Sequence, residues 1–554
     1  MITEMPVRRV APPSLVAVSA IALALAACSS SGSAAAKPQA QSSTDTRTSS
    51  TAARTNCAPN RPAPPTVTPV AGTDHDFTMT AFDGAQIRFH WFPITGTAPT
   101  VLMGPGWSEA GATEQGGTGL FGDSPISELH EDGYHVLTWD PRGFGSSTGT
   151  ITVDAAEGEA RDVQSLIDWV ATQPDAVLDA PTDPRVGMVG GSYGGGIQLV
   201  TAAIDCRVDA IVPTIAWNSL RTSLAKADTV KIGWSDLLYR AAAGRQLDPH
   251  ITSAYESGQA TGTISPPDTA WFVSRGPAQL LGQITAPTLL IQGTVDTLFT
   301  LDEAIRNYRV LRAHGVPTAM LWYCGGHGVC LTKGGDPQRT RDATTAWLRR
   351  WLLRDRSVDT GPRFDLVDQN GVRFTAPDYP VRVKRRLTAD GSGTLTLTAT
   401  GGSGPTTSTP KTASPIDAIA SGITPARATN SVDVAITSPT AATIVGAPQL
   451  TLDYSGTVPA GERPTRVFAQ LVDDTTGLVL GNQVTPVPVT LDGQPHTVSI
   501  PLEVVAHSLA AGKSVTLQIV ATTVSYAPPR LGGQVELRNI HIALPVAAGL
   551  TRVG

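Results

Sequence analysis

The sequence predicts an α/β domain built on an open, mostly parallel sheet, followed by an all-β sandwich. From about residue 76 to Trp351, short apolar runs alternate with amphipathic segments, as expected when parallel strands are buried between helices. After Trp351 the pattern changes to short alternating runs bounded by Gly, Pro and Asp, and neither Trp nor Cys occurs again. The chain has 554 residues, which is enough for two large domains.

Individual elements of the α/β part can be placed by their patterns. Val163, Leu166, Ile167 and Val170 have the i, i+3, i+4, i+7 spacing of a helix with one buried face. Helical and irregular sequence at 217–282 interrupts the alternation, so we expect a cap above the carboxyl ends of the strands, where such sheets bind ligands. The runs with the composition of buried strands are 100–103, 135–139, 186–189, 210–212 and 288–291.

Composition and motifs exclude several classes of function. The formal net charge is −6, and the one dense basic run, 382–386, is interpreted as the solvated face of a strand, so no nucleic acid is expected as a partner. His130 and His135 are one residue too far apart to form a zinc-binding helical pair, and there is no phosphate-binding loop motif. We therefore expect neither a metal nor a cofactor.

The N-terminus indicates export. Arg8 and Arg9 precede an apolar stretch, and the sequence Leu-Ala-Ala-Cys ending at Cys28 resembles a bacterial lipobox. We predict a lipoprotein signal peptide at 1–27 and lipidation of Cys28, the alternative being ordinary cleavage beside a chance cysteine. The polar residues that follow predict a disordered stalk at 28–70. The protein is then expected on the extracytoplasmic face of the cell membrane, held by its lipid anchor.

Four further cysteines fit an oxidising compartment. They are Cys57, Cys206, Cys324 and Cys330, and sequence alone leaves three pairings open. Cys324 and Cys330 bracket a short loop and are candidates for a disulfide, the alternative being free buried thiols.

Two G-x-S-x-G motifs occur, and their contexts differ. The motif at 145–149 follows a strand and a turn, but no helix begins behind it. The motif at 190–194 follows the strand at 186–189 and leads straight into a helical segment, which is the strand–turn–helix context of a nucleophile elbow. Ser192 is therefore the predicted nucleophile.

A serine nucleophile needs a base, and the base needs an acid to orient it. Asp296 follows the strand at 288–291, and His327 lies in a glycine loop after the apolar run 320–323, which matches the order Ser, Asp, His. Asp302 better fits the ordinary role of an acidic residue at a helix start.

An oxyanion hole requires two preorganised N–H donors. The backbone N–H of Tyr193, directly after the nucleophile, is one candidate. The backbone N–H of Trp107, in the loop after the strand at 100–103, is the other.

The ordered set of D-P-R-G-F-G-S-S-T-G at 140–149, G-G-S-Y at 190–193, Asp296 and His327 resembles the Xaa-Pro dipeptidyl-peptidase and cocaine esterase family of α/β-hydrolases. The resemblance covers roughly residues 76–545 and implies an α/β-hydrolase fold with a helical cap and a C-terminal jelly-roll-like sandwich. It also implies hydrolysis of an acyl bond through an acyl-enzyme on Ser192. Members often supply a tyrosine hydroxyl to the oxyanion hole, but the loop at 104–111 contains no tyrosine.

These observations together predict a hydrolase domain at 71–356, with its cap at about 217–282, and a β-sandwich domain at 357–554. The leading hypothesis is a lipid-anchored serine peptidase resembling Xaa-Pro dipeptidyl-peptidases. A carboxylesterase acting on small or lipidic acyl esters is the alternative, favoured if the cap forms an apolar pocket. A catalytically inert binding protein of the cell envelope is the third possibility.

Overall fold

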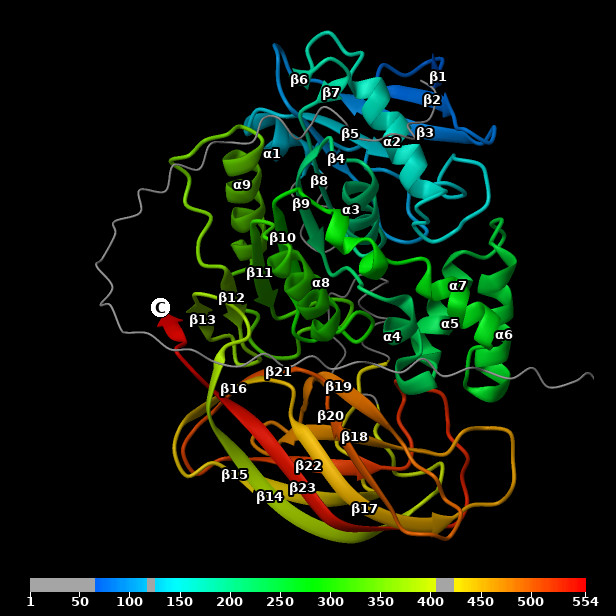
Figure 1. Ribbon diagram of the computed structural model, residues 1–554, viewed down its shortest axis with the longest axis vertical. Coiled ribbons are helices and arrows are strands. Elements are labelled where there is room, and N and C mark those ends of the chain that lie inside the picture. The colour runs from blue at the N-terminus through cyan, green and yellow to red at the C-terminus, as the bar shows by residue number, and fades with distance from the viewer. Residues whose placement is uncertain (1–64, 117–124, 405–422) are drawn as a thin grey trace, which may run out of the picture. The chain divides into compact units, whose positions relative to one another are not determined.

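The computed structural model describes residues 65–116, 125–404 and 423–554. A 12-stranded sheet is formed mainly by strands from the first part of the chain (Figure 1). Neighbours from β5 to β12 pair in parallel, whereas the strands at both ends are antiparallel. In sheet order the strands are β1 (Thr66–Pro69), β2 (Asp76–Thr80), β3 (Gln86–Phe92), β5 (His135–Trp139), β4 (Thr100–Met103), β8 (Val186–Gly191), β9 (Val208–Thr214), β10 (Thr288–Gly293), β11 (Thr318–Tyr323), β12 (Phe364–Val367), β13 (Arg373–Ala376) and β24 (Thr551–Val553).

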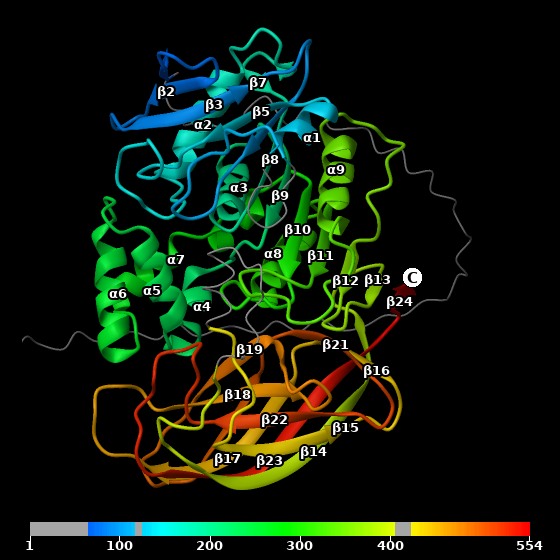
Figure 2. The same ribbon diagram turned by 180° about the vertical axis from the view of Figure 1, so that it is seen from behind.

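Helices cover both faces of this sheet (Figures 1 and 2). On one face pack α2 (Glu159–Val170), α3 (Tyr193–Ile204) and α8 (Leu301–Ala313), and on the other α1 (Ile126–Glu131) and α9 (Arg339–Trp351). The four apolar residues of α2 that have helical spacing, from Val163 to Val170, are completely buried. This burial explains why the segment forms a helix that packs on the sheet. The five predicted strands correspond to β4, β5, β8, β9 and β10, and the fold is that of an α/β-hydrolase, as predicted.

The predicted cap is helical and lies between β9 and β10. The side chains of Asp248 and Ser265 accept N–H groups at the starts of two of its helices, each of which has a proline in its first turn. The cap comprises α4 (Leu220–Leu224), α5 (Ile232–Ala241), α6 (Pro249–Thr261) and α7 (Pro266–Val273), with short 3₁₀ turns at Lys226–Asp228, Pro277–Gln279 and Leu281–Gln283.

Two antiparallel sheets with a common apolar core form the predicted C-terminal β domain. One contains β14 (Arg382–Thr396), β16 (Ala442–Gly446), β17 (Gln449–Thr457), β20 (His496–Pro501), β21 (Val505–Leu509) and β23 (Gln534–Ala548). The other contains β15 (Ser431–Thr437), β18 (Arg466–Asp473), β19 (Val479–Pro488) and β22 (Ser514–Val520). A small separate hairpin, β6 (Leu178–Ala180) and β7 (Asp183–Pro184), precedes β8.

The large sheet extends beyond the limits 71–356 expected from sequence. Strand β1 lies within the segment predicted as a stalk, and β12 and β13 lie beyond residue 356. Strand β24, which follows the sandwich, returns to pair with β13. These additions cover the edges of the parallel strands, which would otherwise present unpaired backbone groups.

Cys28 and the predicted signal peptide lie outside the described residues. Among the helices that the structure describes, none is long and apolar enough to cross a membrane.

Candidate active site

Ser192 occupies a sharp turn between β8 and α3. Its φ of 56° is unusual for a residue with a side chain, so the turn is strained. A Cβ on Gly190 or Gly194 would lie 2.4 or 2.1 Å from the carbonyl oxygen of Gly104. Only glycine permits this close approach of the loop after β4, and the two motif glycines are therefore structural requirements of the elbow.

The structure brings Ser192, Asp296 and His327 together. His327 Nε2 lies 2.8 Å from Ser192 Oγ, and His327 Nδ1 lies 2.8 Å from Asp296 Oδ2. All three side chains are buried, and each comes from a loop at the carboxyl end of a parallel strand, namely β8, β10 or β11. With Nδ1–H donating to the carboxylate, Nε2 is left to accept the serine hydroxyl proton.

Asp296 is held as an oriented carboxylate. Its Oδ1 accepts the backbone N–H groups of Leu298 and Phe299 at 3.0 and 2.8 Å, and its Oδ2 faces both His327 and the amide of Gln292. The alternative acid, Asp302, lies in the first turn of α8, the ordinary position suggested by sequence.

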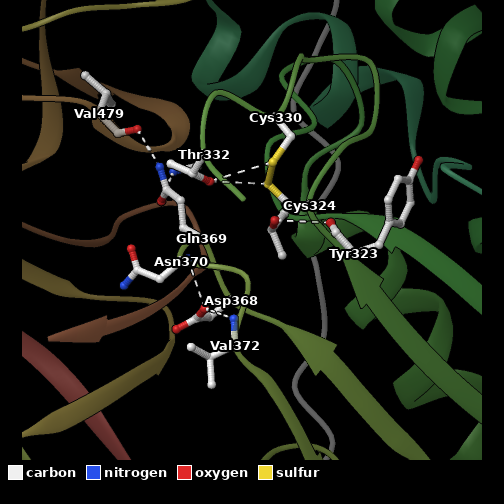
Figure 3. Close-up of a disulfide and its surroundings, with 11 residues drawn as sticks. Tyr323, Cys324, Cys330, Thr332, Asp368, Gln369, Asn370, Val372 and Val479 are labelled. Atoms are coloured by element: carbon white, nitrogen blue, oxygen red, sulfur yellow. Dashed lines mark hydrogen bonds between the residues drawn. A yellow bond between two sulfur atoms is a disulfide. The ribbon is translucent and has the colours of Figure 1, made fainter. Parts of the chain in front are cut away.

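His327 lies in a loop closed by a disulfide between Cys324 and Cys330, the pair suggested by the sequence (Figure 3). The Thr332 hydroxyl lies 3.7 Å from both sulfur atoms. Trp234 of the cap packs edge-to-face against the imidazole, with ring centroids 5.7 Å apart. The ring is thus fixed both by its own loop and by the cap. Cys206 is also disulfide-bonded.

Two glutamines that sequence analysis missed support the site. Gln198 on α3 donates to the carbonyls of Gly190 and Gly194 at 3.0 and 2.8 Å and so braces the elbow. Gln483, on β19 of the sandwich, donates from Nε2 to the backbone carbonyl of Asp296 at 2.7 Å. Nothing in the local sequence of Gln483 indicates this role, because its partner lies 187 positions away.

The two predicted oxyanion donors lie at the correct end of the sheet. Trp107 and Tyr193 both line the cavity that contains Ser192. Among the hydrogen bonds of the described residues, neither backbone N–H has an acceptor, which leaves both donors available. The Tyr193 hydroxyl points elsewhere, because it donates to Glu159 at 3.4 Å.

The first G-x-S-x-G motif is a structural turn. Asp140 accepts the N–H of Ser146 at 2.7 Å and the N–H of Gly111 at 2.8 Å, so it ties this turn to the loop after β4. Burial opposes ionisation of Asp140, but its hydrogen bonds with His90 and these N–H groups outweigh burial and lower the pKa of the carboxyl. Arg142, three residues before this motif, binds the buried Asp162 through two nitrogens.

A cavity of about 100 Å³ opens onto Ser192 beneath the cap. Its lining is almost entirely apolar and aromatic, with Trp217, Phe272 and Phe299 among its walls, and the described residues contribute no Asp, Glu, Lys, Arg or His side chain to it. In the described ranges, no group of three or more His, Cys, Asp or Glu is arranged to hold a metal ion.

Comparison with known proteins agrees with this geometry. Residues 83–328 match the sequence model of the X-Pro dipeptidyl-peptidase family, S15. Over these residues the chain is similar to the X-Pro dipeptidyl-peptidases. The family resemblance predicted from the sequence motifs is thereby confirmed.

Curated relatives match only parts of this hydrolase. The polyketide transferase grgF of Penicillium is 26% identical over 142 residues, which is 25% of this chain and 43% of the relative. A polyketide transferase of Gibberella fujikuroi is 25% identical over 194 residues, covering 32% of this chain and 55% of the relative. The hydrolase thus spans about half the length of these two proteins.

Solved structures of similar fold cover most of the hydrolase. They include a CocE/NonD family hydrolase from Staphylococcus aureus (TM-score 0.61, 13% identity, 86% of this chain and 93% of that one). An aminopeptidase from a Thaumarchaeota archaeon (TM-score 0.62, 14%, 87% and 98%) and an α-amino acid ester hydrolase (TM-score 0.64, 13%, 86% and 98%) also match. At such low identity the likeness shows the fold.

Proposed function

We propose that the hydrolase cleaves acyl bonds through a covalent acyl-enzyme on Ser192. The observation that carries this proposal is the continuous hydrogen-bond chain from the Ser192 hydroxyl through His327 to Asp296. An inert binding protein would have no need for a strained serine, a buried base and an oriented acid at one point, so the geometry argues against that alternative.

In the proposed reaction, Ser192 Oγ attacks the acyl carbon while its proton passes to His327 Nε2. Asp296 stabilises the resulting imidazolium through Nδ1–H. The backbone N–H groups of Tyr193 and Trp107 bind the oxyanion. His327 then protonates the leaving group. In deacylation, water attacks the acyl carbon while His327 takes its proton, and His327 then returns that proton to Ser192 Oγ.

The composition of the cavity favours an ester with a neutral, apolar acyl group as the substrate. A dipeptidyl-peptidase must bind a free ammonium group one residue away from the scissile bond, and an ammonium group without a paired carboxylate is expensive to bury. The lining offers no carboxylate. Cleavage of Xaa-Pro peptides, the reaction named by the matching family, is therefore the second candidate function.

Two measurements test this proposal. A fluorophosphonate probe should add once to the wild-type chain and not to Ser192→Ala, as read by intact mass; no adduct on a folded wild type would refute the acyl-enzyme. We then expect kcat/KM for p-nitrophenyl phenylacetate to exceed that for its α-amino counterpart, p-nitrophenyl phenylglycinate, by about 100-fold. A preference for the amino compound, or for Ala-Pro-p-nitroanilide, would favour the peptidase.

We also propose that Cys28 anchors the hydrolase at the extracytoplasmic face of the membrane. Support comes from the lipobox-like sequence and from the disulfides at Cys206 and at Cys324–Cys330, since disulfides persist mainly in oxidising compartments. An alkyne-tagged fatty acid should label the wild type and not Cys28→Ser. Equal labelling of both would exclude this anchor.

A further inference from the structure

A second recess lies away from Ser192, where the end of the large sheet meets the sandwich. It has a volume of about 490 Å³, within the range of small-molecule sites. Strands β13 and β24 of the large sheet form one side, and β14, β16, β21 and β23 of the sandwich form the rest. We call this recess the basic groove, after the side chains of Lys384, Arg385 and Arg552 that line it.

None of the described residues neutralises the positive charge of the basic groove. No acidic side chain lines it, and no ion pair within the described ranges involves any of its three cations. Nearby Arg373, by contrast, pairs with Asp365 at 2.7 Å. Three neighbouring cations repel one another, and an anion held between them would relieve that repulsion. The chain as a whole carries a formal charge of −6, so this surface is an exception.

The backbone of β14 is irregular at Lys384, one of the cations of the groove. Val383 lies opposite Ala547 and Arg385 opposite Val546, so Lys384 is an extra residue on its strand, a β-bulge. Successive side chains of a regular strand point to opposite faces, but here Lys384 and Arg385 both line the groove. The bulge thus brings two consecutive cations of the largely exposed basic run to one recess.

The remainder of the lining indicates the kind of anion. Thr440, Thr443 and Ser508 also line the groove, where Arg385 donates to the Thr440 hydroxyl at 2.9 Å, and among the described residues Ser508 Oγ is buried without a hydrogen-bond partner. Phe374 and Val546 supply apolar surface beside them. Charged donors and hydroxyls suit phosphate oxygens, and the apolar surface suits a hydrocarbon group attached to the phosphate.

We propose that the basic groove binds a phosphate-bearing amphiphile with net negative charge. Both an anionic phospholipid headgroup in a membrane and a dispersed phosphorylated amphiphile have this chemistry. The site is separate from the cavity at Ser192 and does not depend on the function proposed for that cavity.

The test uses the chain without residues 1–28, so that no lipid anchor contributes to binding. Probes are submicellar dihexanoylphosphatidylglycerol, dihexanoylphosphatidylcholine and inorganic phosphate, with binding measured by calorimetry. Vesicles containing phosphatidylglycerol form a separate arm, measured by co-sedimentation. The groove variant is Lys384→Gln/Arg385→Gln/Arg552→Gln. Its control, Arg382→Gln/Arg386→Gln/Lys513→Gln, removes the same charge from exposed positions that do not line the groove.

We expect phosphatidylglycerol to bind the wild type, the groove variant to bind it at least tenfold more weakly, and the control to change affinity by less than about threefold. Binding in the vesicle arm identifies a membrane headgroup as the source, and binding of the dispersed lipid alone identifies a soluble ligand. The thermal unfolding midpoint should stay at the wild-type value in both variants, which shows that they fold. Equal losses of phosphatidylglycerol affinity in the two variants would overturn the proposal, because the lipid would then be attracted by the general positive charge of the surface and not by the groove. Absence of binding, or equal affinity for phosphatidylcholine or inorganic phosphate, would also overturn it.

Discussion

Gln483 links the sandwich to the candidate acid through one buried hydrogen bond. Gln483→Leu removes the donor to the Asp296 carbonyl and puts an apolar side chain of similar size in its place. We expect kcat on a neutral ester to fall about tenfold with little change in KM, because a small displacement of Asp296 misorients His327 but leaves the acyl cavity intact. Steady-state kinetics measure this split.

The matched control is Gln534→Leu, which changes an exposed glutamine of the same domain. It should leave both constants unchanged. If Gln483→Leu lowers the free energy of unfolding and yet retains the wild-type kcat, Gln483 stabilises the fold without positioning the acid.

Residues at the site differ in how far sequence could predict them. Ser192, Asp296 and His327 each follow a recognisable apolar strand, and a fixed chain order distinguishes them from other Ser, Asp and His residues. Gln198 and Gln483 follow no such rule: Gln198 acts on backbone carbonyls of the adjacent elbow, and Gln483 acts on a carbonyl brought to it by tertiary packing.

At the scale of elements, the loop between β11 and α9 carries the base. The Cys324–Cys330 disulfide closes a ring of seven residues around His327. Chain-entropy estimates give such a ring about 2 kcal/mol of stabilisation. We expect Cys324→Ala/Cys330→Ala to lower kcat several-fold with KM nearly constant, since the imidazole then samples orientations away from Ser192.

Treatment with a reductant should reproduce this loss in the wild type. The double variant is the control for the other disulfide, at Cys206, because reductant should not lower its kcat further. A further loss on reduction of the variant would assign the effect to Cys206 instead.

The elbow between β8 and α3 depends on the absence of a side chain at Gly194. Its Cβ would lie 2.1 Å from a backbone oxygen, which no side-chain rotation can relieve. We expect Gly194→Ala to abolish labelling by a fluorophosphonate probe and to lower the thermal midpoint. Gly334→Ala, at a position with open space around it and no positive φ, controls for the intrinsic cost of adding a Cβ. Wild-type labelling of Gly194→Ala would contradict this packing argument.

Across the whole molecule, the two domains are interleaved more than the sequence suggested. The last helix among the described residues ends at Trp351, where the sequence pattern also changes. That change of pattern could not show that β12, β13 and β24 complete the large sheet, because short edge strands have the same composition as sandwich strands. Pairing between β24 and β13 depends on where the chain leaves the folded sandwich. Local sequence patterns do not encode that position.

A buried ion pair also joins the cap to the sandwich. Lys226 Nζ lies 2.5 Å from Glu503 Oε1, and the glutamate is almost fully buried. Burial alone would raise the pKa of Glu503, but Lys226 and Lys231 outweigh burial and lower it. The ionised glutamate therefore stabilises the fold above the ordinary glutamate pKa of about 4.3, and this contribution is lost as the pH falls through the lower pKa of the folded state.

A double-mutant cycle tests that pair. Glu503→Gln or Lys226→Met alone should lower the free energy of unfolding at pH 7 by about 1–3 kcal/mol, because each removes the shortest charged contact of its partner, while Asp302, 3.3 Å from Lys226 Nζ, and Lys231 near Glu503 remain. The double variant should lose less than the sum, and the difference should shrink in urea titrations below about pH 4. The exposed pair Asp236–Arg240 is the control and should show no measurable coupling. Strict additivity at Glu503 and Lys226 would mean that apolar packing, and not this ion pair, holds the cap against the sandwich.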